Sequence, residues 1–191
     1  MPSSISETLS RIVRLFEENA VPYMLIGGYA LAYLGRIRAT VDIDLAVSAK
    51  PDSPDEDEGR GVEILVGLLM RNRYSVSFGD PRNPMFLVHD EVSGNEIEVW
   101  HRLDGVSIDE YALKRRLRVK TPSGLKLWII DAEDFIVNKL ARPDRSAVDE
   151  EDVASVLMEQ QGKLDIIYLY GRAERAGVLS LLKSLQNRIM T

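Results

Sequence analysis

Apolar residues near the N-terminus recur at intervals of three and four, and this spacing predicts an amphipathic helix over residues 6–19. Ser4 and Glu7 stand at capping-box spacing at its start. Residues 23–26 then form a short apolar run, which predicts a buried strand. The apolar residues that recur at this spacing are Ile5, Leu9, Ile12, Val13 and Phe16.

The stretch 37–47 alternates between apolar and polar residues, and this period of two predicts one strand with two different faces. Aspartate is among the poorest strand formers, so two aspartates on one face indicate a specific role. Residues i and i+2 of a strand lie about 7 Å apart, and carboxylate oxygens at that spacing suit magnesium or manganese. The apolar face holds Ile37, Ala39, Val41, Ile43, Leu45 and Val47, and the polar face holds Arg38, Thr40, Asp42 and Asp44.

Two glycines stand where the apolar run 23–26 gives way to a predicted short helix over 29–34. Glycines at a strand-to-helix turn let the backbone approach a ligand closely, and a helix N-terminus presents free N–H groups to phosphate. We therefore expect the backbone N–H groups of Gly27, Gly28 and Tyr29 to receive phosphate oxygens.

The order of these motifs resembles the DNA polymerase β superfamily of nucleotidyltransferases. A strand, Gly27-Gly28, a short helix and Arg-x-Thr-x-Asp-x-Asp in the next strand match its signature over about 25 residues. The chain is most similar to the small "minimal" and type IV toxin-like (abortive-infection) branches. The resemblance implies an α+β fold with a mixed β-sheet and flanking helices. It divides the chain into a nucleotidyltransferase-like core over 1–130 and a helical C-terminal extension over 131–191.

The same resemblance implies a catalytic metal site. Asp42 and Asp44 would hold one or two magnesium (or manganese) ions that bridge the phosphates of a nucleoside triphosphate. The family has a third carboxylate on a later strand, which corresponds here to Glu98, with Glu96 as a competitor on the same face. Glu98 would complete the metal site and help to deprotonate an acceptor hydroxyl.

The expected nucleotide-binding side chains are Arg38, Thr40 and Lys139. Lys139 emerges beside the apolar stripe of a predicted helix over 132–141, where its ammonium group needs an anion. That anion is either a nucleotide phosphate or a structural carboxylate, for which Asp149 and Asp152 are candidates. The corresponding series in similar minimal nucleotidyltransferases is a Lys, an Arg and an Asp-rich helix start, here Lys139, Arg145 or Arg142, Asp149 and Asp152.

The remaining pattern alternates helices with strands and ends in helices alone. The acidic, proline-containing stretch 49–61 predicts a surface loop. Further helices are predicted over 62–72, 105–113, 148–160, 165–175 and 178–190, and strands over 74–78, 85–89, 96–100, 117–120 and 125–129.

Composition narrows the class of protein. The 191 residues are 45% hydrophobic, which is enough for a sizeable core. The formal net charge of −6 opposes non-specific binding along an extended nucleic acid. The absence of cysteine excludes disulfides and thiolate chemistry, and no apolar run approaches the length of a membrane span. We expect a cytoplasmic protein.

The sequence thus predicts a metal-dependent nucleotidyltransferase that moves a nucleoside monophosphate, from ATP or another triphosphate, to an acceptor hydroxyl. Relatives in the superfamily use transfer RNA, protein or small molecules such as antibiotics as acceptors. Toxin-like relatives work beside an antitoxin, which would be a partner of this chain. The alternative is a catalytically inactive binding or scaffold protein with the same fold.

Overall fold

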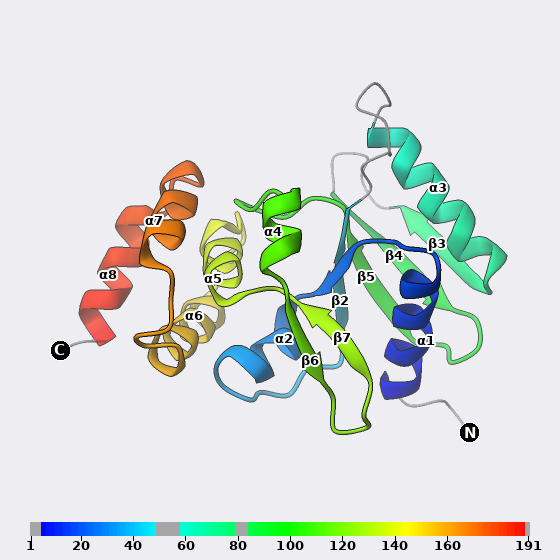
Figure 1. The fold of residues 1–191 in the computed structure, drawn as a ribbon, viewed down its shortest axis with the longest axis horizontal. Coiled ribbons are helices and arrows are strands. Elements are labelled where there is room, and N and C mark those ends of the chain that lie inside the picture. Colours follow the sequence, from blue (N-terminus) through cyan, green and yellow to red (C-terminus); the bar gives the residue numbers. More distant parts are fainter. Residues whose placement is uncertain (1–4, 49–57, 79–83, 190–191) are drawn as a thin grey trace. The chain divides into compact units, whose positions relative to one another are not determined.

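The computed structural model describes residues 5–48, 58–78 and 84–189. The fold is α+β, as predicted, with a mixed seven-stranded sheet in the order β3-β4-β5-β2-β1-β7-β6 (Figure 1). The strands are β1 (Tyr23–Leu25), β2 (Ile43–Val47), β3 (Tyr74–Phe78), β4 (Met85–Asp90), β5 (Glu96–Trp100), β6 (Leu117–Lys120) and β7 (Lys126–Ile129). The helices are α1 (Ile5–Glu18), α2 (Gly27–Leu34), α3 (Glu58–Arg71), α4 (Glu110–Arg115), α5 (Ala132–Ala141), α6 (Ala147–Glu159), α7 (Ile166–Arg175) and α8 (Leu179–Ile189).

The chain divides into two compact units. Unit 1 contains nearly all of the sheet together with α1 and α3, and unit 2 contains the other helices. Unit 1 comprises Met1–Leu25, Val41–Arg102 and Arg118–Trp128, and unit 2 comprises Ile26–Thr40, Leu103–Leu117 and Ile129–Thr191.

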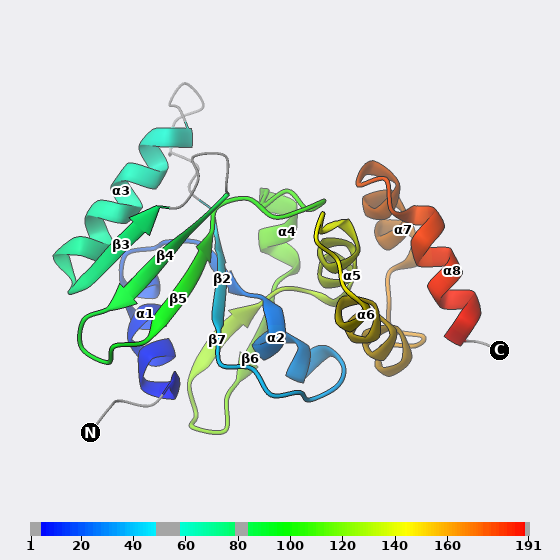
Figure 2. The ribbon, with the colours of Figure 1, turned by 180° about the vertical axis from the view of Figure 1, so that it is seen from behind.

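In unit 1, helices α1 and α3 cover the same face of strands β3 to β5 (Figures 1 and 2). The predicted apolar stripe of α1 is confirmed, because Ile12 and Phe16 are fully buried. Arg11 of α1 forms an ion pair with the buried Asp90 at the end of β4. Burial opposes ionisation of Asp90, but the hydrogen bond from Arg11 leaves the pKa of this carboxyl below its ordinary value.

Strands β2 and β5 run parallel at the centre of the sheet. Strand β2 pairs antiparallel with β1 and parallel with β5. Four of its five residues are buried, and Asp44 is the half-buried exception. The register opposite β5 therefore decides which side chain lies beside Asp44.

The predicted strand over 37–47 is wrong in its first half, because β2 begins only at Ile43. Ile37 is 86% exposed and Val41 is 74% exposed, so these residues do not face the core as predicted. Arg38 and Thr40 are half-buried instead. Residues 37–41 therefore still alternate, but the polar residues are the less exposed ones. Arg38 is held by an ion pair with Asp152, and the methyl group of Thr40 packs against Gly28.

The other predicted elements agree with the structure within a few residues, except near residue 105. The predicted helix over 105–113 is observed as α4, which begins only at Glu110. Gly105 has a positive φ of 67°, and Asp109 caps the helix by accepting a hydrogen bond from Ala112 N. Ser4 and most of the predicted loop over 49–61 lie outside the described residues, and α3 begins within that stretch, at Glu58.

Unit 2 is a helical assembly in which α5 packs on α6 and α7. Its core contains a buried polar network rather than apolar side chains alone. The hydroxyl of Tyr168 lies 2.9 Å from both carboxylate oxygens of Asp134 and accepts a 2.7 Å hydrogen bond from Arg172 Nε. None of the helices described in either unit is long and apolar enough to cross a membrane.

Asp134 makes stability depend on pH. Burial, reinforced by the neighbouring Asp131 carboxylate, raises its pKa from 3.8 to about 7. The native state therefore keeps a proton that the unfolded chain has lost, so the free energy of unfolding falls as pH rises from about 4 to 7, with a slope of up to 1.4 kcal/mol per pH unit. Asp134→Asn should flatten this part of the profile when urea unfolding is measured from pH 4 to 8. Asp144→Asn, at a 71% exposed carboxyl, is the control, and equal profiles for both variants would contradict the prediction.

Candidate active site

Asp44 and Glu98 are brought side by side by the parallel pairing of β2 and β5. Their Cα atoms are direct partners in the register, and both side chains are half-buried. Neighbouring strands lie about 4.8 Å apart, and directly paired residues share one face of the sheet. Trp100 Nε1 donates a 3.3 Å hydrogen bond to Glu98 Oε2, which restrains that carboxylate.

The other two acidic residues considered lie at the edge of this arrangement. Asp42 is exposed and precedes β2 by one residue. Glu96 is exposed at the start of β5, where its register partner is His89 of β4. The pairing thus places Glu98, rather than Glu96, opposite Asp44.

The Asp44–Glu98 pair fits a magnesium ion. Like charges in directly paired positions repel each other, and a divalent cation would convert that repulsion into attraction. Magnesium usually takes one or two protein carboxylates and completes its octahedron with water and substrate phosphates. Within the described residues no group of three or more acidic, histidine or cysteine side chains is arranged to hold a metal ion.

The glycine turn opens helix α2 in unit 2. The helix begins at Gly27, whose φ is +63°, and the preceding residue, Ile26, makes no side-chain capping bond. An α-helix supplies no intrahelical acceptor for the N–H groups of its first turn, which here begins with Gly27 and Gly28. This is the geometry in which helix N-termini receive anions.

Thr40 lies against this turn and leaves no room for a side chain at Gly28. A Cβ atom built at Gly28 would stand 2.8 Å from Thr40 Cβ. We expect Gly28→Ala to lower the free energy of unfolding by about 1–3 kcal/mol through overpacking. Chemical unfolding measures this, and adding Thr40→Gly should recover part of the loss. A double variant no more stable than Gly28→Ala would show that the contact with Thr40 is not the cause.

A cluster of basic side chains in unit 2 converges on Asp152, which is fully buried. Arg36 Nη2 and Nε lie 2.8 and 3.0 Å from Asp152 Oδ1, and Arg38 Nε lies 3.3 Å from Oδ2. The side chains of Arg36 and Arg38 are 35% and 32% exposed, so both guanidinium groups can also meet solvent or a ligand. Sequence reasoning missed Arg36, although it stands two residues before Arg38.

Lys139 is buried in the same cluster. Its Nζ lies 2.9 Å from Asp149 Oδ1 and 3.7 Å from Asp152 Oδ2, the two structural carboxylates that the sequence offered as partners. Burial alone would raise the pKa of Asp149, but the hydrogen bonds from Lys139 and Ser146 lower it to about 2. Arg142 Nη1 lies 3.7 Å from Asp149, whereas Arg145 donates to the carbonyl of Leu140. Arg142, rather than Arg145, therefore extends the cluster.

Solved structures define the class of fold as nucleotidyltransferase-like. The chain is similar to the solution structure of the antibiotic-resistance factor ANT(2'')-Ia (TM-score 0.55, 16% identity, covering 98% of this chain and 94% of that one). It is similar to the crystal structure of ANT(2")-Ia in complex with adenylyl-2"-tobramycin (TM-score 0.51, 15%, 95% and 97%). It is also similar to an antigenic nucleotidyltransferase-like protein from Paracoccidioides brasiliensis (TM-score 0.53, 15%, 96% and 91%).

The family follows from the sequence. The family described as "Nucleotidyl transferase of unknown function (DUF2204)" matches residues 5–175, and the chain belongs to this family. Comparison with curated proteins gives no match.

Proposed function

We propose that this protein is a magnesium-dependent nucleotidyltransferase that transfers a nucleoside monophosphate, with ATP as the first candidate donor, to the hydroxyl group of a small molecule. The observation that carries the proposal is the direct pairing of Asp44 with Glu98 across β2 and β5, in a chain of a nucleotidyl transferase family. The small-molecule acceptor rests on the likeness to ANT(2")-Ia, which was solved with an adenylylated antibiotic.

In this mechanism Asp44 and Glu98, joined by Asp42, would hold the metal ion. The bound ion would neutralise charge on the triphosphate and on the leaving oxygen. Glu98 accepts the proton of the acceptor hydroxyl, and the hydrogen bond from Trp100 keeps one of its oxygens in place. The acceptor oxygen forms a bond to the α-phosphorus as the bond to the β-phosphate oxygen breaks, and pyrophosphate leaves.

Groups that suit phosphate are available within unit 2. The N–H groups of Gly27, Gly28 and Tyr29 donate to phosphate oxygens, with the hydroxyl of Thr40 as a further donor. Arg38 makes the longest guanidinium contact with Asp152, 3.3 Å, so it is the side chain that changes partner from Asp152 to phosphate. Lys139 stays with its carboxylates and contributes a fixed positive charge.

A binding module without catalysis is the second candidate. It is favoured by one observation, that the described residues hold no cluster of three metal-ligating side chains. Such a module would bind a triphosphate without turning it over. Its affinity for triphosphate would not depend on Asp44 or Glu98.

The test is to incubate the protein with each α-³²P-labelled nucleoside triphosphate and magnesium, in separate reactions with aminoglycosides, total transfer RNA and a cell lysate. The proposal predicts label on a small molecule and release of pyrophosphate. Label on RNA or on a protein would show that the acceptor is a macromolecule and not a small molecule. That result would favour a toxin-like role, and an antitoxin partner would then be sought. Binding of triphosphate without label in any reaction would support the non-catalytic module.

A further inference from the structure

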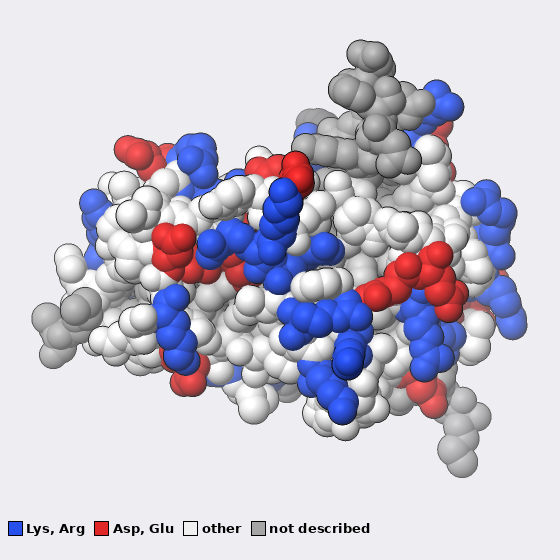
Figure 3. Space-filling model, viewed as in Figure 1, with Lys and Arg blue, Asp and Glu red and all other residues white. Residues whose placement is uncertain are grey.

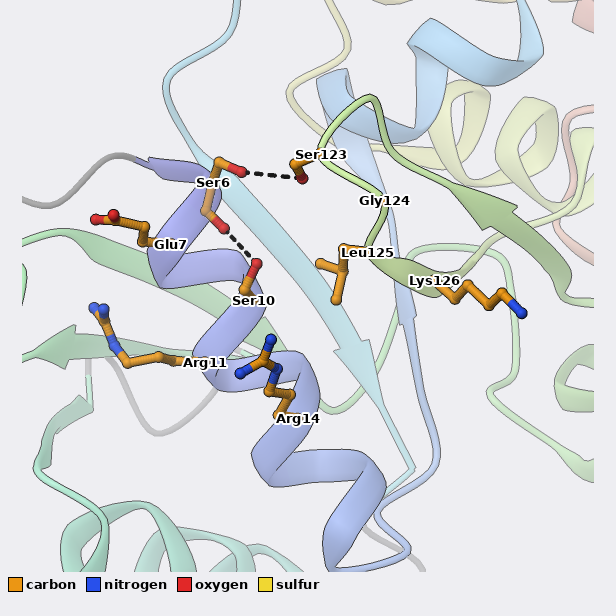
Figure 4. Close-up of a pocket in the computed structure, with 9 residues that line it drawn as sticks. All are labelled: Ser6, Glu7, Ser10, Arg11, Arg14, Ser123, Gly124, Leu125 and Lys126. Atoms are coloured by element: carbon orange, nitrogen blue, oxygen red, sulfur yellow. Dashed lines mark hydrogen bonds between the residues drawn. The ribbon is translucent and has the colours of Figure 1, made fainter.

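A groove in unit 1 lies between the N-terminal half of α1 and the β6–β7 hairpin (Figure 4), and its lining includes none of the residues of the proposed transfer site. Its volume is about 610 Å³, within the range of small-molecule sites. Helix α1 contributes Ser6, Ser10 and Arg14, and the hairpin contributes Ser123, Leu125 and Lys126.

Hydroxyl groups line both walls of this groove. Ser6, Ser10 and Arg14 are spaced by four residues and therefore share one side of α1. Figure 4 shows Ser6 and Ser123 facing each other, with their Oγ atoms 3.4 Å apart. Ser10 Oγ already donates a 2.8 Å hydrogen bond to the carbonyl of Ser6, and Ser123 Oγ lies 2.9 Å from Thr121 Oγ1. The 3.4 Å contact of Ser6 is long for a bond between hydroxyls, so Ser6 is the hydroxyl that can turn to donate to a ligand oxygen.

The lining carries a net positive charge. It contains Arg11, Arg14 and Lys126 against the single carboxylate of Glu7, a formal charge of +2 that the ion pair of Arg11 with Asp90 reduces to +1. Arg11 is held by Asp90, whereas Arg14 and Lys126 are exposed and make no ion pair with any residue that the structure describes. Figure 3 shows further basic side chains gathered over the β6–β7 hairpin, where Arg118 and Lys120 also lie.

We propose that this groove binds a phosphate group, carried by a compact phosphate monoester. Such a group has a charge of about −1.5 to −2 at pH 7 and three acceptor oxygens, which suit the positive charge of the lining and the hydroxyl of Ser6. Leu125, between the two walls in Figure 4, offers an apolar contact to the organic part of the ester. The chain's net charge of −6 opposes a long polyanion and favours this compact ligand.

The experiment is calorimetric titration with inorganic phosphate and with phenyl phosphate at low ionic strength, with ¹⁵N-resolved NMR to locate the site. The test variant is Arg14→Gln with Lys126→Gln, and the matched control is Lys120→Gln, which removes a charge from the same hairpin without lining the groove. We expect at least a tenfold rise in Kd for the double variant and less than a twofold rise for the control. The three positions are exposed, so thermal unfolding should confirm that both proteins fold.

Each outcome decides the proposal. Tighter binding of phenyl phosphate, with amide shifts at Ser123 and Gly124, supports a monoester ligand, whereas equal affinities support free phosphate as the source of the same group. Repeating the titration with the Asp44→Asn variant distinguishes binding in this groove from binding at the proposed transfer site. The Kd for phosphate in the groove should be unchanged in that variant. No saturable binding, or equal weakening by Lys120→Gln, would overturn the proposal.

Discussion

Asp44→Asn is expected to lower the initial rate of nucleotidyl transfer by at least about 10³-fold without unfolding the protein. The amide keeps the shape of the side chain but removes the charge that would hold the metal ion. Without metal, the change removes one of two like charges in directly paired positions and so relieves their mutual repulsion. Rates come from transfer of labelled nucleotide at saturating magnesium, and stability comes from thermal unfolding in EDTA.

The matched pair Glu98→Gln and Glu96→Gln tests the assignment of the third carboxylate. Both changes remove one charge from β5, but only Glu98 lies opposite Asp44. Glu98→Gln should lower the rate by at least about 10²-fold, and Glu96→Gln by less than about threefold. Equal losses for the two variants would contradict the assignment of Glu98.

Lys139→Met is expected to lower the free energy of unfolding by about 3 kcal/mol. The change leaves the buried Asp149 without its ion-pair partner at 2.9 Å. It also removes a positive charge that lies 3.7 Å from the buried Asp152. For a chain of this size, the loss corresponds to a fall of about 6–12 °C in the thermal midpoint. Lys163→Met is the control, because Lys163 is exposed in the same unit, and it should change the stability by less than about 0.5 kcal/mol.

The pH dependence identifies the cause of that loss. The pKa of Asp149 in the folded protein is about 2, below its ordinary value of 3.8. A lowered pKa stabilises the native state above pH 3.8, and this contribution disappears as pH falls toward 2. Lys139→Met should therefore lose most stability at neutral pH and approach the native protein in acid. If the variant kept full stability but lost affinity for triphosphate, Lys139 would be a direct phosphate ligand instead.

Local pattern was enough to predict α1, the β4–β5 hairpin and the helical end of the chain, because each depends on spacing between neighbouring residues. It failed at 37–42, where the alternation of residue types is real but the burial is inverted. The inversion depends on Asp152, more than 100 residues away from Arg36 and Arg38, and no local pattern could reveal that pairing.

In the candidate site, too, local sequence identifies some residues, whereas others depend on contacts between distant parts of the chain. The Gly-Gly turn and the Asp-x-Asp motif are contiguous in sequence, so their residues could be named in advance. The choice between Glu96 and Glu98 could not be made, because both stand on the same face of β5 and only the register with β2 distinguishes them. Arg36 was missed because its role depends on the same distant carboxylate as that of Arg38.

The most direct test of the central claim is the binding of an ATP analogue with a methylene bridge between its α- and β-phosphates, followed by thermal unfolding with and without magnesium. At one hundred times its Kd such a ligand stabilises a protein by about 2.7 kcal/mol. We predict this stabilisation for the native protein only when analogue and magnesium are both present, and its loss in Asp44→Asn and Glu98→Gln. Equal stabilisation without magnesium, or in both variants, would contradict the claim that this pair holds a metal–triphosphate complex.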